Sequence, residues 1–157
     1  MKIRGILVGV ASVALLTLSV YAADGIKLEG IKCVMNPKAA AKAEKSVEYK
    51  GGKVFFCCDN CPKGFAKKIE AKDKVTAAKG NAQLVATGQA KQAKCVFTGG
   101  PLKTKLTVNG ATIQFCCNNC KGKAEKMSGD DQLVALIGDA AYKKGGFKVA
   151  KAKAKKE

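Results

Sequence analysis

The chain contains two copies of one cysteine pattern, and this repeat constrains the fold more than any other feature of the sequence. Each copy has a lone cysteine in the frame Lys-Cys-Val, a spacer of 23 residues in the first copy and 20 in the second, and then the run Cys-Cys-x-x-Cys. All eight cysteines belong to the pattern: Cys33, Cys57, Cys58 and Cys61, then Cys95, Cys116, Cys117 and Cys120. Because self-similarity at such a period marks repeated structural units, we expect two tandem modules.

Each copy has the pattern of a β-hairpin followed by an α-helix, so we expect an α+β fold built from two such modules. In the first copy the expected elements are a strand at 46–50, a turn at Gly51-Gly52 and a return strand at 53–58. In the second they are a strand at 106–108, a turn at Asn109-Gly110 and a return strand at 112–117. Asn-Gly is a strong signal for a two-residue hairpin turn.

Short polar side chains mark the expected helix starts. Asp59-Asn60 and Asn118-Asn119 have side-chain oxygens that accept hydrogen bonds from free backbone N–H groups. They predict helices beginning near Cys61 and Cys120.

Two apolar runs lie outside the cysteine pattern. We interpret the run at 83–87 as a short strand that follows the end of the first helix, and a similar run is found at 132–137. Both runs would pack on the modules and enlarge cores that are otherwise thin, because units this small bury little apolar surface.

The first 25 residues have the pattern of a secretory signal peptide. Lys2 and Arg4 form a positive start, 6–20 is an uncharged apolar stretch too short to span a bilayer comfortably, and Val20-Tyr21-Ala22 matches a small-x-small cleavage site. We expect residues 1–22 to be removed after Ala22, with an uncleaved N-terminal anchor as the alternative. The mature protein would then be periplasmic or secreted.

The rest of the chain divides into three parts: a first repeat with its linker at 23–92, a second repeat at 93–147 and a basic Lys/Ala tail at 148–157. The formal net charge is +17, or +15 without Lys2 and Arg4. Lysines are spread along the sequence and the single arginine lies in the signal segment, whereas nucleic-acid readers commonly use arginine for forked contacts. We therefore expect no nucleic-acid site, and contact with anionic surfaces only through the lysine-rich tail.

The cysteine spacing favours a metal site in each copy. A hairpin returns the chain so that the lone cysteine lies near the end of the second strand, and a helix starting there brings a later cysteine to the same point. Thiolates from separate segments then converge on one cation about 2.3 Å away. Adjacent cysteines in a strand point to opposite faces, so one of each pair lies elsewhere.

We expect two sets of three ligands: Cys33, Cys57 and Cys61, and Cys95, Cys116 and Cys120. Cys58 and Cys117 would be either fourth ligands or buried core thiols.

In these residues the chain resembles the TRASH and YHS domains, which are small treble-clef-like cysteine modules. The first copy matches through Cys33, the segment Val47-Glu48-Tyr49-Lys50-Gly51-Gly52-Lys53, the segment Val54-Phe55-Phe56-Cys57-Cys58-Asp59-Asn60-Cys61, and Phe65. The second matches through Cys95, Val108-Asn109-Gly110 and Phe115-Cys116-Cys117-Asn118-Asn119-Cys120. The resemblance covers about two thirds of the mature chain.

The resemblance implies binding of heavy-metal ions, zinc or copper, with roles in metal sensing, storage or trafficking. We expect each repeat to hold one zinc or copper(I) ion through cysteine thiolates. Some related zinc fingers carry a second cysteine where this chain has Asn36 and Thr98. That departure leaves a position open for exchange, which suits a carrier that hands its metal to another metal-handling protein.

Two other interpretations stay open. An exported protein with an even number of cysteines is often a disulfide-stapled scaffold, and eight cysteines allow 105 pairings. A cysteine at a helix start also suits thiol-disulfide exchange, because the helix dipole stabilises its thiolate. Other enzyme classes are disfavoured, since the chain has no histidine and no convincing carboxylate pair, and we expect a binding protein without catalytic residues.

Overall fold

The computed structural model describes residues 26–150. The expected signal peptide, its cleavage site after Ala22 and most of the basic tail lie outside these residues. Within 26–150, no helix has the length and apolar character needed to cross a membrane.

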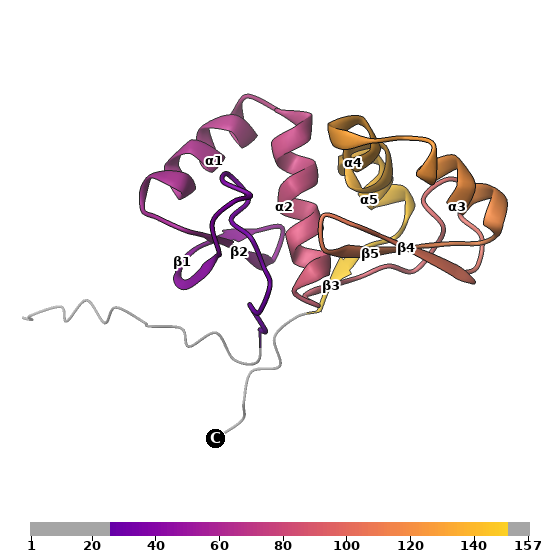
Figure 1. Cartoon of the computed structure of the whole chain (residues 1–157), viewed down its shortest axis with the longest axis horizontal. Helices are drawn as coiled ribbons and strands as arrows, with labels where there is room; N and C mark the ends of the chain where they lie inside the picture. Colours follow the sequence, from indigo (N-terminus) through magenta and orange to yellow (C-terminus); the bar gives the residue numbers. More distant parts are fainter. Residues whose placement is uncertain (1–25, 151–157) are drawn as a thin grey trace, which may run out of the picture.

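The described chain mixes small hairpins with helices, which confirms the α+β class (Figure 1). Its elements are, in order, β1 (Lys42–Tyr49), β2 (Gly52–Phe56), α1 (Asn60–Glu70), α2 (Lys74–Ala86), β3 (Ala90–Lys91), β4 (Thr104–Val108), β5 (Ala111–Phe115), α3 (Asn118–Glu125), α4 (Gly129–Ile137), α5 (Asp139–Lys144) and β6 (Lys148–Val149). Antiparallel pairs join β1 to β2, β4 to β5, and β3 to β6.

Both hairpins close through two-residue turns whose residues have positive φ. These residues are Lys50 and Gly51 in the first hairpin, with φ of 51° and 81°, and Asn109 and Gly110 in the second, with φ of 48° and 75°. Such turns match the right-handed twist of the flanking strands. The second turn lies where the sequence predicts it, whereas the first comes one residue early.

Gly52 lies in β2 instead of in the turn, and the packing of the hairpin explains why it is glycine. It pairs with Tyr49 across the strands. A Cβ atom at Gly52 would lie 2.8 Å from Leu84 Cδ2 and 3.0 Å from Gln89 Oε1. The glycine therefore allows the hairpin to approach α2 closely, and its presence in the sequence is not a turn signal.

The two apolar runs are helical, so the expected strand at 83–87 is wrong. Residues 83–86 end α2, a separate helix whose N-cap residue Asp73 accepts a hydrogen bond from Thr76 N at 2.6 Å. The run at 132–137 lies in α4. Because α2 is buried at eight of its thirteen positions, its apolar residues show no one-sided helical period and resemble a buried strand.

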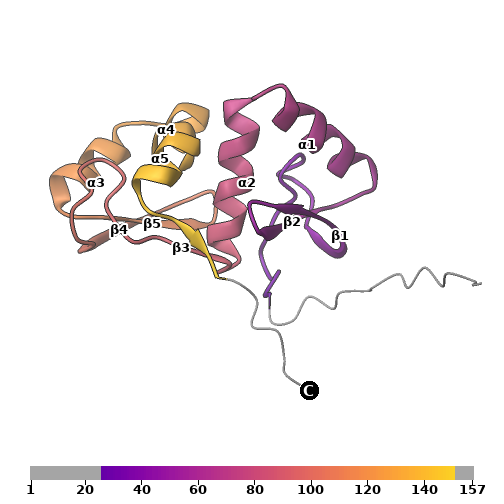
Figure 2. The same cartoon turned by 180° about the vertical axis from the view of Figure 1, so that it is seen from behind.

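Helix α2 lies between the two hairpins, as both views show (Figures 1 and 2). It packs against β2 on one side, β5 on the other, and α4 and α5. Leu84 of α2 is fully buried in one core that takes residues from both copies, among them Phe56 and Phe115. The two copies therefore share a core around α2.

The outer edge of each return strand is hydrogen-bonded by glutamine side chains. Gln83 Oε1 accepts from Phe55 N at 2.6 Å while its Nε2 donates to Phe55 O at 3.0 Å. Gln89 makes the same pair with the backbone of Lys53, at 2.7 Å each. These amides satisfy edge groups of β2 that would otherwise need a third strand or water.

In the second copy a different glutamine has this role. Gln92 Oε1 accepts from Gln114 N at 2.7 Å, and its Nε2 donates to Gln114 O at 2.8 Å. Gln114 lies in β5, so the free edge of the second hairpin is also bound by an amide side chain.

The chain returns to the first linker at its C-terminal end. Lys148 and Val149 form β6 and pair with Lys91 and Ala90 of β3. The first two residues of the segment assigned to a basic tail, Lys148 and Val149, are therefore paired, because the backbone of β3 provides partners for them.

Replacing Leu84 with Ala should lower the free energy of unfolding by about 2–5 kcal/mol, because the side chain is fully buried and leaves a cavity. Both copies should unfold in one transition, since each packs on α2. Urea denaturation followed by far-ultraviolet circular dichroism measures both, with Lys105→Ala on the exposed face of β4 as a control. Two separated transitions would contradict the shared core.

Candidate metal centres

Three thiols of the first copy converge although they come from three segments. The Sγ atoms of Cys33, Cys57 and Cys61 all lie within 4.8 Å of one another. Cys33 lies in a tight loop that is closed by its own N–H donating to Ala39 O at 2.9 Å. Cys57 follows the end of β2, and Cys61 lies in the first turn of α1. The hairpin and the helix therefore position the three thiols together.

The second copy repeats this arrangement with Cys95, Cys116 and Cys120, whose Sγ atoms also lie within 4.8 Å of one another. The Cys95 loop is closed by its N–H donating to Gly100 O at 2.9 Å. Cys116 follows β5 and Cys120 lies in the first turns of α3. Two separate groups with one geometry indicate that the repeat reproduces a site as well as a fold.

The thiol spacing fits a metal ion. A tetrahedral zinc site with bonds of about 2.3 Å separates its sulfur atoms by about 3.8 Å. Cys57 Sγ lies 3.6 Å from Cys61 Sγ, and Cys116 Sγ lies 3.6 Å from Cys120 Sγ. Thiolates favour zinc and copper(I) over hard cations such as magnesium. Each group could therefore hold one soft or borderline ion with little movement of the chain.

Cys58 and Cys117 are exposed, so their placement as buried core thiols is wrong. The strands end one residue before each cysteine pair, at Phe56 and Phe115, so the alternation of a strand does not apply to the pairs. Each of the two cysteines lies beside the three-thiol group of its own copy.

The sulfur atoms of these two cysteines contact different neighbours. Cys58 Sγ is 3.2 Å from Cys61 Sγ, and Cys117 Sγ is 3.6 Å from Cys116 Sγ. All eight cysteines are free thiols in the structure.

The expected asparagine and aspartate caps do not form at the helix starts. Asp59 is at the N-cap of α1, but its side chain pairs with Lys45 Nζ at 2.6 Å instead of capping. In α3 the N-cap residue is Cys117, and Asn118 is already helical. The N–H groups at these helix starts instead face cysteine sulfur. The pKa of Cys58 is lowered by its contact with the Cys61 thiol and by the backbone N–H of Cys61.

Within the first group the thiols differ in acidity. Burial opposes ionisation of Cys33, but backbone N–H groups, including that of Asn36, outweigh it and lower its pKa. Contact with Cys58 and then burial raise the pKa of Cys61 far above its usual range. Burial and the neighbouring Cys33 raise the pKa of Cys57. The metal-free group therefore favours one thiolate among protonated neighbours, and an ion would have to displace the remaining protons.

The second group shows the same contrast more strongly. Burial opposes ionisation of Cys95, but the backbone N–H and hydroxyl of Thr98 outweigh it and lower its pKa to about 6. Burial and contacts with Cys116 and Cys117 raise the pKa of Cys120 to about 12. The Thr98 hydroxyl also lies 3.2 Å from Cys116 Sγ. Thr98 is therefore a polar neighbour of this site, at the position where some zinc fingers carry a second cysteine.

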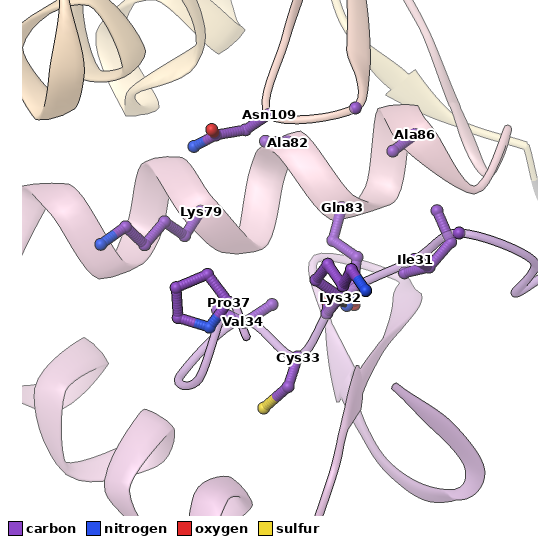
Figure 3. A pocket seen from close by; sticks show the side chains of 12 residues that line it. Ile31, Lys32, Cys33, Val34, Pro37, Lys79, Ala82, Gln83, Ala86 and Asn109 are labelled. Carbon is purple, nitrogen blue, oxygen red and sulfur yellow. Dashed lines mark hydrogen bonds between the residues drawn. The ribbon is translucent and has the colours of Figure 1, made fainter. Parts of the chain in front are cut away.

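A hollow of about 330 Å³ lies behind Cys33 and is separate from its thiol group (Figure 3). Its walls are the loop at 30–37, the face of α2 that carries Lys79 and Ala82, and the turn Asn109-Gly110. Figure 3 shows the Cys33 sulfur pointing away from α2. The hollow thus adjoins the backbone of Cys33 and does not belong to the metal-binding side.

The sequence interpretation missed the glutamines that hold the cysteine loops. Gln83 Nε2 donates to Lys32 O at 2.9 Å, and Gln92 Nε2 donates to Lys94 O at 2.7 Å. Each amide thus ties the residue before the lone cysteine to the edge of its hairpin. The two residues do not align between the copies, so repeat comparison does not find them. The only signal is that three of the five glutamines fall between 83 and 92.

Replacing Gln92 with Ala should weaken metal binding at the second group and leave the first unchanged, because it frees the Lys94–Cys95 loop from β5. The loss of stability should be about 1–2 kcal/mol for these partly exposed hydrogen bonds. Competition with a chromophoric chelator measures both affinities. Gln89→Ala is the matched control, because Gln89 binds the edge of β2 but no residue beside a cysteine. Equal affinity losses in the two variants would contradict a positioning role for Gln92.

Cys95 should ionise before the other thiols of the reduced, metal-free protein. Titration from low to high pH, followed by thiolate ultraviolet absorbance, should show a step near pH 6. That step should disappear in Cys95→Ser and shift upward in Thr98→Val, which loses the hydroxyl hydrogen bond. An unchanged step in Cys95→Ser would show that another thiol carries this charge.

No protein-family model matches the chain, and neither does any curated protein or any solved structure. The function of the two thiol groups must therefore be inferred from their geometry.

Proposed function

We propose that the protein binds one zinc or copper(I) ion in each repeat, through Cys33, Cys57 and Cys61 in the first and through Cys95, Cys116 and Cys120 in the second. The observation that carries this proposal is the convergence of three thiols in each copy, at spacings close to those of a metal-thiolate site.

The order of elements supports a treble-clef-like module of the TRASH or YHS type. In each copy a cysteine loop precedes a hairpin, the hairpin ends at a second cysteine, and a helix starts with a third. A module this small gains stability from a bound ion, since an ion that binds only the folded state stabilises it by about 2.7 kcal/mol at a hundred times its dissociation constant.

The segment at 1–22 supports export to the periplasm or the outside of the cell, where the protein would store or carry metal. Three thiols leave one position of a tetrahedral ion open, which favours a carrier over a purely structural site. We propose no catalytic residues for this role.

One observation favours a second candidate, thiol-disulfide exchange. Cys58 is exposed, and its Sγ lies 3.2 Å from Cys61 Sγ, whereas a disulfide bond is about 2.05 Å long. The pair needs only a small approach to bond. Oxidation would remove Cys61 from the first ligand group, so the oxidised form and a fully metal-loaded first site exclude each other.

Native mass spectrometry of the mature protein, purified from its export compartment without reductant, should show two bound ions. A thiol count under denaturing conditions with chelator should give eight free thiols. Cys33→Ser and Cys95→Ser should each lose one ion, and the double variant should lose both. Met35→Leu, which removes another sulfur near Cys33, is the control and should keep two.

No bound metal together with four disulfides would refute the proposal in favour of a stapled scaffold. A partly oxidised mixture that dithiothreitol reduces readily would favour the exchange of disulfides.

A further inference from the structure

We infer that Cys58 and Cys117 are exchange thiols, through which each ion passes to an acidic partner protein that presents a pair of thiols. This inference rests on the proposed metal binding and deepens it, since it assigns a role to the two cysteines outside the three-thiol groups.

The exposure of the thiols gives each site an inner and an outer side. Cys33 is 2 % exposed and Cys95 is fully buried, so no partner reaches the ion from their side. Cys58 and Cys117 are exposed in both copies. The two copies differ in many other residues, yet both bury the lone cysteine and expose the outer one. This shared order of exposure indicates a common direction of metal entry and exit.

The outer thiols contact the ligand groups without belonging to them. Cys58 Sγ reaches Cys61 Sγ at 3.2 Å, and Cys117 Sγ reaches Cys116 Sγ at 3.6 Å. Neither belongs to the group of three sulfurs that lie within 4.8 Å of one another. Each is thus placed to bond an ion at its open position, on the side that faces solvent.

Lysine side chains lie near both sites and favour a negatively charged partner. Lys45 pairs with Asp59, the neighbour of Cys58, and Lys42 and Lys63 also act on that carboxylate. At the second site the ammonium groups of Lys123 and Lys144 both lie at Phe97.

Phe97 lies two residues from Cys95, and its ring stacks on Phe115, the residue before Cys116. Positive charge therefore lies beside each site, and the chain without residues 1–22 carries a formal charge of +15. Such a field attracts an acidic partner and accelerates its encounter.

The transfer involves no change of oxidation state. A partner thiol releases its proton and its sulfur bonds the ion, after which the bond from the ion to Cys58 breaks and the Cys58 thiolate takes up a proton. The second partner thiol then replaces Cys61 in the same way. The bonds from the ion to Cys57 and to the buried Cys33 break last, and these two thiolates take up protons from solvent. Cys117 has the same role for the second ion, with Cys95 last.

The test compares the unchanged mature protein with Cys58→Ser/Cys117→Ser after loading with two equivalents of zinc. Native mass spectrometry gives the number of bound ions. A time course then follows zinc transfer to two synthetic dithiol peptides of the form Cys-x-x-Cys, one acidic and one basic. Cys57→Ser/Cys116→Ser is the matched control, which should lose its ions because it removes a ligand from each group.

We expect the Cys58→Ser/Cys117→Ser variant to keep two ions but to transfer them at least roughly ten-fold more slowly. The unchanged protein should transfer faster to the acidic peptide than to the basic one, and added salt should reduce that difference.

Four outcomes would overturn the inference. Equal transfer rates in the variant would remove the role of the two thiols, and loss of its ions would make them permanent ligands. Equal rates for the two peptides would remove the acidic partner. A disulfide formed during transfer, detected by thiol count, would replace ligand exchange with redox release. Where zinc does not bind, the loading step is repeated with copper(I). Failure of the unchanged protein to bind either ion would appear before any transfer is measured, and would refute the proposed function itself.

Discussion

The close packing of both hairpins against α2 is the constraint on which the rest of the structure depends. It requires small residues where the elements meet. A Cβ atom at Gly80 would lie 3.0 Å from the rings of both Phe65 and Tyr49, and Gly110 in the second turn lies against Ala86. Since the hairpin ends carry Cys57 and Cys116, the position of α2 also fixes where the two thiol groups form. A helix shared in this way makes the two sites parts of one folding unit, although the sequence presents them as separate copies.

Polar groups on α2 also determine how the neighbouring elements are placed around it. Asn81 is fully buried, donates to Ile137 O at 2.8 Å and accepts from Lys50 Nζ at 2.9 Å. The Lys50 ammonium also pairs with Asp139 at 2.5 Å and lies about 5 Å from the rings of Tyr49 and Tyr142. The turn of the first hairpin is therefore bound to residues that follow the second cysteine run. The buried Asn81 amide favours this one arrangement of the surrounding elements, because any other leaves its polar atoms unpaired.

Local sequence signals predicted the hairpins, the helix starts after the cysteine pairs and the separation of each cysteine set into three inner thiols and one other. The Asn109-Gly110 turn, for example, is determined by two residues alone. The errors arise where tertiary packing, and not the local sequence, determines the local structure. Gly52 is needed for a close contact with Leu84 and is not part of the turn. Residues 83–86 are helical, but burial on most sides of α2 removes the helical period from their sequence. Gln83 and Gln92 were missed since their role is a long-range contact that no spacing encodes.

The glutamine side chains on the outer edges of β2 and β5 have a consequence beyond positioning the cysteine loops. A two-stranded hairpin exposes backbone donors and acceptors along its edges, and such an edge is a template on which strands of other molecules add to build intermolecular β-structure. Glutamine amides already bind the backbone of Phe55, Lys53 and Gln114, so the strands of other molecules cannot pair with these residues. The chain is thereby protected against aggregation by its own side chains, at the strand edges that support its thiol groups.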